Sequence, residues 1–268
     1  MTVVAKLGGS VIKKGFPPAF LNDLKTLTNR DRVVLIHGGA DIVTMTAEKL
    51  GKPTQYVVSP DGMRSRYTDR ETAEIYTMVM AGKINKSLVA ALLRHGIRAL
   101  GLSGADGTLL RAERKKRLMI LDERGRKVMI DGGYTGKITQ VNAQLLEDLF
   151  KVGVVPVVAP VAVDEDFELV NVDSDRAAAY VAGALKAHSL IVFTDVPGII
   201  LNNTTVSKLN VDDAKRRIHE IGHGMKKKVY AAVEALQMGT TEVVISSGTL
   251  DAPITSALSH EAGTLIVP

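Results

Sequence analysis

Two glycine-rich turns near the start of the chain have the composition of anion-binding loops. The first, KLGGS, runs from Lys6 to Ser10, and the second, HGGAD, runs from His37 to Asp41. Each follows a run of apolar residues typical of a buried strand, and its glycines leave backbone N–H groups unobstructed. A lysine beside such amides suits phosphate oxygens. Either turn alone more often closes a tight bend than binds a ligand, but two of them after successive strands favour a phosphate site.

A third turn carries two arginines ahead of a helix. In GMRSRYTDRE, Arg64 and Arg66 precede Thr68, the predicted N-cap of the helix, and Asp69 falls in its first turn. A guanidinium group matches a carboxylate through two parallel hydrogen bonds, so these arginines could clamp an acidic substrate. A solvated capping segment is an alternative of equal weight.

Two later segments place charge where helices begin. In LVNVDSDRAA, Asn171, Asp173 and Asp175 cluster where a strand enters a helix, and all three could be caps. In GHGMKKKV, the lysine triplet 226–228 enters another predicted helix, although positive charge near a helix N-terminus opposes the macrodipole. A local conflict of this kind is expected where a nearby anion compensates it. At least one of these lysines is therefore predicted to meet phosphate.

Several familiar catalytic patterns are absent. GGYTGK at 132–137 has the wrong spacing for a Walker A loop and is followed by Ile138 rather than Ser or Thr. No GxGxxG fingerprint opens the first strand–helix–strand unit, and no HExxH motif occurs. The six histidines are scattered, and four of them are each better explained as structural than as catalytic, namely His37, His95, His188 and His223.

Composition narrows the class of protein. The 268 residues are 46% hydrophobic and 24% charged, which is ordinary for a globular chain. Cysteine is absent, which excludes disulfides and thiolate metal ligands and fits a reducing cytosol. Aromatic residues make up only 4%, with no Trp, which argues against a nucleic-acid platform of stacked rings. With neither a signal peptide nor an apolar segment long enough to span a bilayer, the sequence predicts a cytoplasmic protein without a membrane partner.

The elements that must position these groups alternate along the chain. Short, almost continuously apolar runs are typical of parallel strands covered on both faces. They lie at 2–9, 32–39, 96–104, 154–163, 189–198, 241–248 and 263–268. Helical patterns lie at 17–28, 40–51, 69–95 with a break near Gly82, 142–151, 173–187, 211–220 and 224–238. This alternation predicts an α/β fold, a three-layer αβα sandwich around a mainly parallel sheet.

One stretch breaks that rhythm. Residues 106–136 alternate in strand fashion with turn signals between, and they predict an inserted antiparallel β-hairpin. Within it, residues 111–127 contain eight Lys or Arg and three Asp or Glu, a net charge of +5 that equals the net charge of the whole chain. The basic character of the protein is therefore concentrated in this hairpin.

The segments KLGGS, IHGGA, GMRSRYTD, NVDSD, TDVPG and GMKKKV, in this order, resemble the amino acid kinase family. Each motif is weak alone, but six in order over essentially the whole chain make the resemblance specific. Within the family the chain is similar to acetylglutamate kinases and, more closely through SRYTD and GGYTGK, to the lysine-biosynthesis kinases that act on carrier-bound aminoadipate. The resemblance implies a single amino acid kinase domain of carbamate kinase-like fold over 1–268, with a substrate-binding lobe at 1–178 and a nucleotide-binding lobe at 179–268.

The resemblance also implies an activity, the ATP-dependent, Mg²⁺-dependent conversion of a side-chain carboxylate to an acyl phosphate. A carboxylate with a pKa of about 4.3 is already ionised at neutral pH and needs no general base, whereas its approach to a polyanionic nucleotide needs positive charge. By this resemblance, Lys6 and Lys228 would stabilise the transferring phosphoryl group, and Asp175 would orient both lysines. The backbone amides of Gly9 and Gly39 would contact the phosphoryl group.

The remaining site residues follow from the same resemblance. The substrate would be bound by Gly38, Gly39, Ala40, Arg64 and Asn171. The nucleotide would be bound by Gly8, Ser10, Asp195, Gly222, Gly224 and Met225, and no residue is assigned to a metal. Ala40 stands where the family commonly has a third glycine, which requires a negative φ there. Asp173 stands where the family often has Asn and adds negative charge near ATP.

The basic hairpin has three competing interpretations. The resemblance implies a small acidic amino-group carrier protein of the LysW type, which holds the substrate through its C-terminal glutamate. A positive rim would dock such a carrier, and it would consist of Arg66, Arg114, Lys115, Lys116 and Arg117. A solvated hairpin that only aids solubility is the second interpretation. Nucleic-acid binding is the least favoured, because no aromatic residues are interleaved with the basic ones.

The hypothesis from sequence is therefore a kinase of carrier-bound 2-aminoadipate in lysine biosynthesis. Aminoadipate and glutamate differ by one methylene, and a binding pocket discriminates between such substrates by only about 10–200-fold. Carrier-bound glutamate is therefore a second expected substrate, which would add a role in arginine biosynthesis. One rival is an acetylglutamate kinase that acts on the free metabolite, and another is a non-catalytic nucleotide-binding sensor. The family suggests a homodimer.

Overall fold

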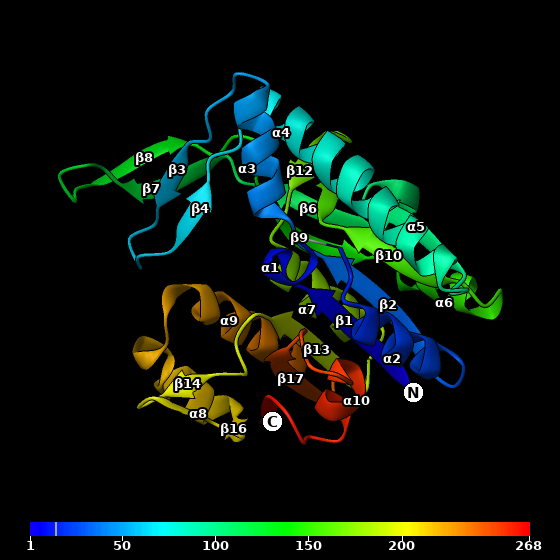
Figure 1. Ribbon diagram of the computed structural model, residues 1–268. Helices are drawn as coiled ribbons and strands as arrows, with labels where there is room; N and C mark the ends of the chain where they lie inside the picture. Colours follow the sequence, from blue (N-terminus) through cyan, green and yellow to red (C-terminus); the bar gives the residue numbers. More distant parts are fainter. Residues whose placement is uncertain (14) are drawn as a thin grey trace.

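The centre of the molecule is an eight-stranded sheet in the order β16-β18-β17-β13-β1-β2-β10-β5 (Figure 1). A computed structural model describes residues 1–13 and 15–268. Neighbouring strands run parallel except for the antiparallel pair β17–β18. The strands are β1 (Thr2–Leu7), β2 (Arg32–His37), β5 (Ala99–Ser103), β10 (Val155–Ala159), β13 (Ser189–Thr194), β16 (Lys208–Asn210), β17 (Glu242–Ser247) and β18 (Thr264–Val267).

Helices cover both faces of this sheet. Successive residues of a strand point to opposite faces, and in β1 the side chains of Val3 and Ala5 pack in one hydrophobic core while Val4 packs in the other. The first core is closed by α2 (Pro18–Thr28), α3 (Ala40–Lys49), α4 (Arg70–Thr77), α5 (Asn85–Arg94) and α10 (Pro253–Leu258). The second is closed by α6 (Ala143–Lys151), α7 (Ser174–Ala184), α8 (Val211–Arg216) and α9 (His223–Gln237). The predicted αβα sandwich is confirmed.

The predicted strand over 154–163 divides at Pro160. β10 belongs to the main sheet and ends at Ala159, whereas β11 (Val161–Val163) belongs to a different sheet. Proline has no backbone N–H to donate to a sheet ladder, so the chain changes direction there.

The helical pattern at 69–95 is continuous rather than broken near Gly82. Between α4 and α5 the chain forms a π-helix, η1 (Met78–Ile84), and Gly82 lies inside it. The N-cap is Asp69 rather than the predicted Thr68, since the Asp69 carboxylate accepts a hydrogen bond from the backbone N–H of Thr72 at 2.8 Å. Sequence patterns also missed short helical elements, namely α1 (Gly9–Ile12), α10 and the 3₁₀ turns η2 (Asp106–Thr108) and η3 (Ile218–Glu220).

The predicted antiparallel excursion is confirmed and is larger than expected. One four-stranded sheet, in the order β12-β11-β6-β9, contains β6 (Leu110–Arg114), β9 (Gly136–Val141) and β12 (Leu169–Asn171). A second, in the order β4-β3-β7-β8, pairs the hairpin β7 (Arg117–Leu121) and β8 (Lys127–Asp131) with β3 (Tyr56–Val58) and β4 (Arg64–Arg66). A short hairpin of β14 (Ile200–Leu201) and β15 (Thr204–Thr205) completes the strands of the described residues.

The main sheet runs without interruption through both expected lobes. β1 from the first lobe pairs with β13 from the second, and residue 178 lies inside α7. The division into a substrate-binding and a nucleotide-binding lobe therefore stays a prediction about function. None of the helices in the described residues is both long and apolar enough to cross a membrane.

Candidate active site

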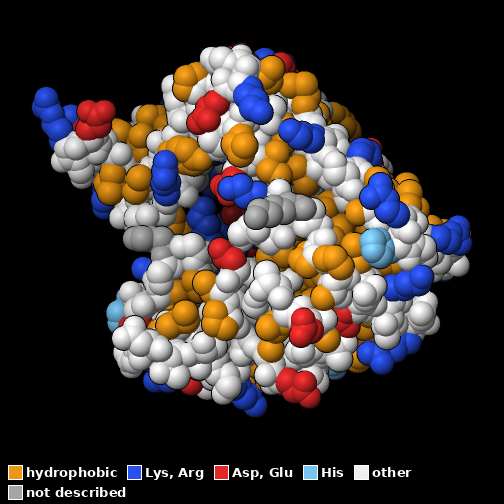
Figure 2. Space-filling view, in the orientation of Figure 1, with side chains coloured by type: hydrophobic (Ala, Val, Ile, Leu, Met, Phe, Trp, Pro, Cys, Tyr) orange, Lys and Arg blue, Asp and Glu red, His pale blue; other side chains and the backbone are white. Residues whose placement is uncertain are grey.

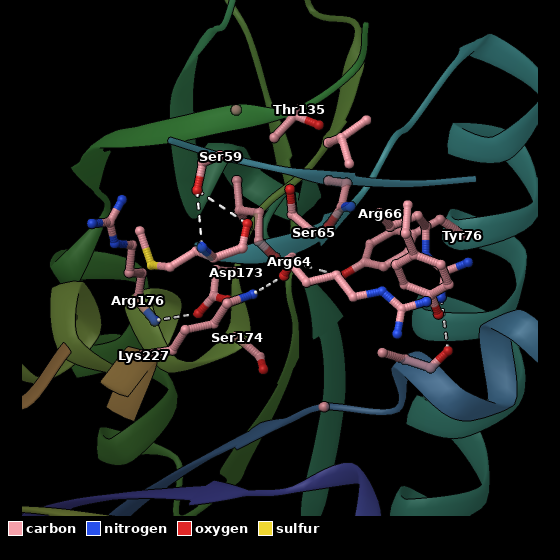
Figure 3. A pocket seen from close by; sticks show the side chains of 18 of the residues that line it. Ser59, Arg64, Ser65, Arg66, Tyr76, Thr135, Asp173, Ser174, Arg176 and Lys227 are labelled. Carbon is pink, nitrogen blue, oxygen red and sulfur yellow. Dashed lines mark hydrogen bonds between the residues drawn. The ribbon is translucent and has the colours of Figure 1, made fainter. Parts of the chain in front are cut away.

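A cleft of about 640 Å³ opens where β1 and β2 end. The glycine turns after these strands, the β3–β4 hairpin and the start of α7 all contribute to its lining. The carboxyl ends of parallel strands are the usual place for a ligand in an open α/β sheet. Figure 2 shows the hollow with Lys, Arg, Asp and Glu side chains at its opening, and Figure 3 shows its lining from close by.

Three charged side chains from distant parts of the sequence meet beside this cleft. Nζ of Lys6, in β1, lies 2.7 Å from Oδ1 of Asp175, in the first turn of α7. Nζ of Lys228, in α9, lies 3.2 Å from Oδ2 of the same carboxylate. The side chains of Lys6 and Asp175 are only 4% and 8% exposed. The structure thus brings together the three residues that the resemblance placed at the centre of catalysis.

Burial and charge compete in setting the pKa values of this cluster. Burial alone would raise the pKa of Asp175, but the positive charges of Lys6 and Lys228 outweigh it and lower that pKa to about 2. Burial lowers the pKa of Lys6, and Asp175 opposes that shift. Two ammonium groups share one carboxylate, so the cluster carries an excess positive charge that an incoming anion would neutralise.

A second acidic residue, Asp173, caps α7, so that the Asp175 carboxylate can pair with the two lysines. The Asp173 carboxylate caps α7 by accepting hydrogen bonds from the backbone N–H groups of Asp175 at 2.9 Å and Arg176 at 3.1 Å. The helix end is therefore satisfied without the Asp175 side chain. Of the two readings left open by the sequence, Asp173 is the cap and Asp175 is the ion-pairing residue.

The two glycine turns touch each other at the head of the cleft. A Cβ on Gly9 would lie 3.2 Å from the backbone nitrogen of Gly39, and a Cβ on Gly38 would lie 3.2 Å from that of Gly9. Gly39 has a φ of 140°, which strains any residue with a side chain. Ala40 is the first residue of α3 and is not among the positive-φ residues, so the alanine in place of a family glycine fits.

Gly8 and Ser10 complete the first turn. The backbone N–H of Gly8 donates to the carbonyl of Phe193 at 3.1 Å, which seats the turn on the end of β13. Ser10 is exposed and lines the cleft.

Arg64 and Asn171 both line the cleft. The Arg64 guanidinium lies 3.8 Å from the ring centre of Tyr56, on the neighbouring strand β3. The amide Nδ2 of Asn171 donates to Oγ1 of Thr68 at 3.0 Å, which leaves its carbonyl oxygen for other contacts.

Arg66 does not belong to an exposed docking surface, contrary to the expectation. It is only 8% exposed, and its guanidinium donates to Oγ1 of Thr54 at 2.7 Å, to the carbonyl of Ala40 at 2.9 Å and to Oγ1 of Thr44 at 2.8 Å. These bonds fasten β4 to α3. Arg66 therefore holds the β3–β4 hairpin in place and is not available to a partner in solution.

Four other residues expected to bind a nucleotide, Asp195, Gly222, Gly224 and Met225, are not part of the cleft lining and lie at the end of β13 or the start of α9. α9 has neither a side-chain cap nor an acidic residue in its first turn. A Cβ on Gly222 or Gly224 would meet nothing within 4 Å, so both glycines border open space. Asp195 is exposed directly after β13. Met225, also in the first turn of α9, packs against the hydrophobic core.

The basic stretch after β6 is divided between two environments. Lys115 lines the cleft, whereas Lys116 and Arg117 are exposed. The Arg114 guanidinium donates to the carbonyl of Gly133 at 2.7 Å and lies 4.2 Å from the ring centre of Tyr134, so it also braces the link between β8 and β9. Figure 2 shows further Lys and Arg side chains at the projecting tip of β7–β8.

The structure adds cleft residues that sequence analysis did not select. Arg176 and Lys137 line the cleft, and so do Tyr76, Met80 and Thr135. The Thr135 hydroxyl oxygen is buried and has no hydrogen-bond partner among the described residues, so a ligand in the cleft could satisfy it. Thr135 belongs to GGYTGK, one of the two segments that carry the resemblance to the kinases of carrier-bound substrates.

Positive charge dominates one wall of the cleft. Burial lowers the pKa of Lys115, and the charges of Arg176, Lys137 and Lys227 lower it further against the opposing effect of Asp173. A lysine whose charge is disfavoured by its neighbours is expected where a bound anion restores the balance.

The model of the amino acid kinase family matches residues 1–247. A LysW-aminoadipate/LysW-glutamate kinase from Metallosphaera sedula is 44% identical over 96% of this chain and 97% of its own length. A kinase of the same name from Saccharolobus islandicus is 41% identical over 99% of both chains, and a relative from Cenarchaeum symbiosum is 50% identical over 98% of both.

Solved structures agree on the fold. The structure of smu.665 from Streptococcus mutans superposes with a TM-score of 0.81 at 22% identity, covering 99% of this chain and 98% of that one. Giardia carbamate kinase superposes with a TM-score of 0.65 at 14% identity, covering 99% and 98%. At these identities the likeness establishes a shared fold.

Proposed function

The chain belongs to the amino acid kinase family, and from that premise we propose that it phosphorylates the side-chain carboxylate of 2-aminoadipate held on a small acidic amino-group carrier protein. Carrier-bound glutamate is a second substrate. The observation that carries the proposal is full-length similarity to relatives named for this pair of substrates, combined with two lysines that share one buried carboxylate.

The charge cluster suits a reaction that needs positive charge and no base. The attacking carboxylate is ionised at neutral pH, so the barrier lies in bringing two anions together. Lys6 and Lys228 supply fixed positive charge on two sides of the transferring phosphoryl group, and Asp175 keeps both ammonium groups in place. Preorganised charges of this kind act on the transition state without reorganisation.

The residues at the start of α9 fit the phosphates of ATP. An uncapped helix N-terminus offers free N–H groups and a favourable dipole, and Gly222 and Gly224 leave space beside it. The described residues contain no group of three or more His, Asp or Glu side chains that could hold a metal. A magnesium ion carried chiefly by nucleotide phosphates fits such a site, where it would neutralise phosphate charge.

The acceptor carboxylate would lie at the two glycine turns, and the amino acid backbone would lie farther out. The amides of Gly9 and Gly39 would face the phosphoryl position, and Arg64 would bind the backbone carboxylate of the amino acid. The carbonyl oxygen of Asn171 would accept a hydrogen bond from the amide N–H through which the amino acid is joined to the carrier. Gly38 and Ala40 shape the turn around the reacting end.

The carrier protein would dock on the exposed basic residues beside the cleft. Lys116 and Arg117 are exposed, and Lys115 continues the positive charge into the cleft. An acetylated free metabolite needs no such surface, whereas a positive rim speeds the encounter with an acidic protein.

We also propose that the protein works in the cytoplasm as a homodimer. β5 is an edge strand of the main sheet. Leu100 on β5 is 42% exposed, and Leu93 on the adjacent α5 is 54% exposed. Apolar residues exposed beside an open sheet edge are suited to contact with a second copy. Light scattering on the purified protein tests this assembly.

The function is tested by measuring turnover of carrier-bound aminoadipate, carrier-bound glutamate and free acetylglutamate side by side, with the acyl phosphate trapped by hydroxylamine. The proposal expects kcat/KM to be highest for the two carrier-bound substrates. A higher value for acetylglutamate would assign the chain to arginine synthesis on free metabolites, and nucleotide binding without turnover of any of them would indicate a sensor.

A further inference from the structure

Lys227 forms a contact that the phosphoryl-transfer roles do not explain. Its Nζ donates a hydrogen bond of 2.9 Å to the backbone carbonyl of Arg64 (Figure 3). Lys227 belongs to α9, and Arg64 belongs to β4, so the bond joins the helix at the expected nucleotide site to the hairpin at the expected acceptor site.

The neighbouring residue in α9 makes the second half of the arrangement. Lys228 binds Asp175 at 3.2 Å, and Asp175 in turn binds Lys6. Consecutive residues of an α-helix point about 100° apart. One turn of α9 therefore reaches inward to the catalytic cluster with Lys228 and sideways to the acceptor hairpin with Lys227.

The hairpin is held at two places. Arg66 fastens β4 to α3 through the carbonyl of Ala40 and the hydroxyl of Thr44. Lys227 fastens the same strand two residues earlier, and its side chain is half-buried along the cleft. Ordering a long lysine side chain costs conformational entropy, so a lysine held on a neutral carbonyl is expected where the contact has a use.

We propose that Lys227 is a positioning residue that couples nucleotide binding to acceptor binding. The inference rests on the proposed function, which places the nucleotide beside α9 and the acceptor beneath β3–β4. A nucleotide that orders the start of α9 also orders Lys227, which then holds Arg64 over the acceptor. Because coupling between two binding sites is reciprocal, the acceptor strengthens nucleotide binding by the same factor.

The test compares Lys227→Met with Lys226→Met. Both variants lose one positive charge from the same triplet, but Lys226 does not line the cleft. Calorimetry measures the Kd of carrier-bound aminoadipate in the absence and in the presence of Mg²⁺ and a non-hydrolysable ATP analogue, and the Kd of the analogue alone.

We expect the analogue to tighten acceptor binding to the wild-type protein and to Lys226→Met by about five- to tenfold. In Lys227→Met this tightening should disappear, while the affinity for the analogue alone and for the acceptor alone each change by less than about twofold. A kinetic counterpart is a raised KM for both substrates with a smaller change in kcat.

Where both ligands bind, three results would overturn the inference. The first is unchanged tightening in Lys227→Met, and the second is its absence in the wild-type protein. The third is a large loss of affinity for the analogue or the acceptor alone, which would make Lys227 a direct ligand. If the wild-type protein binds acetylglutamate but not the carrier-bound substrate, the proposed substrate is wrong while the coupling is still measured with acetylglutamate. If neither acceptor binds, both proposals fail.

Discussion

The ammonium group of Lys6 and the carboxylate of Asp175 lie 2.7 Å apart in the interior of the protein. Lys228 contacts the second carboxylate oxygen and is more accessible, with 15% of its side chain exposed. Removing one member of a buried ion pair costs about 3–5 kcal/mol, because the remaining charge keeps its desolvation penalty. We therefore expect the two lysines to contribute unequally: Lys6 to both stability and catalysis, and Lys228 chiefly to catalysis.

This difference can be measured with Lys6→Met and Lys228→Met. Each variant should lose about 10²–10³-fold in kcat, the usual cost of removing one charge that stabilises a transition state. Only Lys6→Met should also lose stability, by roughly 3 kcal/mol. Hydroxamate trapping reports the rate and urea denaturation reports the stability. ATP binding that survives in Lys228→Met without turnover supports catalysis, whereas near-normal turnover in that variant would refute the assigned role.

The basic rim is tested by Lys116→Ala combined with Arg117→Ala. Both residues are exposed, so the double variant should fold normally and lose about tenfold in kcat/KM for the carrier-bound substrate, with a weaker dependence on salt. The KM for ATP should stay the same. Adding Arg114→Ala and Lys115→Ala should deepen the loss, although Arg114 also braces Gly133.

A matched control for the rim is Lys208→Ala with Lys215→Ala. These lysines are exposed on β16 and α8, and the pair removes the same net charge elsewhere. Equal effects of the two double variants would show that net charge, rather than the hairpin, attracts the carrier. A fall in ATP affinity in the rim variant would place the hairpin in the nucleotide site.

His37 should make stability depend on pH. Burial lowers its pKa to about 4, and its ring is held by the carbonyl of Gly38 at 3.0 Å and by Nδ2 of Asn85 at 3.3 Å. The unfolded chain takes up the proton near pH 6.5 and the folded protein only near pH 4. The contribution is therefore fully present above pH 6.5 and is lost as the pH falls towards 4, by about 3 kcal/mol.

Denaturation of His37→Gln at several pH values checks this expectation. The variant should be less stable than the wild-type protein at pH 7, and its profile between about pH 6.5 and pH 4 should be flatter. His219→Gln, which changes an exposed histidine, should keep the wild-type slope. A wild-type slope in His37→Gln would mean that other groups dominate acid unfolding.

Gly39 is constrained by its neighbour in the π-helix. A Cβ at this position would lie 2.2 Å from Cδ1 of Ile84, and the φ of 140° adds backbone strain. Gly39→Ala should cost about 2 kcal/mol or more and lower kcat, since the turn carries a proposed phosphoryl contact. Ala40→Gly, one residue later, should change stability by less than about 1 kcal/mol.

Ile84→Val separates the steric clash from the backbone strain. Valine lacks Cδ1, so the change alone should cost about 1 kcal/mol. Combined with Gly39→Ala, it should restore part of the lost stability, because the two residues are in contact and their effects are not additive. Simple additivity of the two changes would show that strain alone is responsible.

The periodic patterns of the sequence predicted most of the main sheet and its helices. The apolar runs at 2–9, 32–39 and 189–198 form adjacent strands because each is buried on both faces of the sheet. β3 and β4 were missed. Each is three residues long, and β4 reads Arg-Ser-Arg, so the pairing of β3 with β4 and with β7 depends on the tertiary fold.

The site residues were predicted unevenly. Nothing local links Lys6, Asp175 and Lys228, and their meeting was anticipated only through the family resemblance. Arg64 and Arg66 are two residues apart in one strand and share a face, yet α3 covers only Arg66. Burial by a neighbouring helix cannot be inferred from the strand itself. The contact of Lys227 with the carbonyl of Arg64 joins residues far apart in the sequence, and no local pattern predicts it.

The π-helix η1 shapes one wall of the cleft through its width. A π-helical turn holds about one residue more than an α-helical turn, and it lies between the Asp69 cap and Asn85, whose Nδ2 donates to the carbonyl of Val157 at 2.8 Å. Both ends are thus pinned, so the spare length bulges sideways and pushes Ile84 against Gly39. The shape of that wall therefore depends on the number of residues between Asp69 and Asn85. A chain with one residue fewer between these anchors would lose the bulge and would place Met80 differently in the wall.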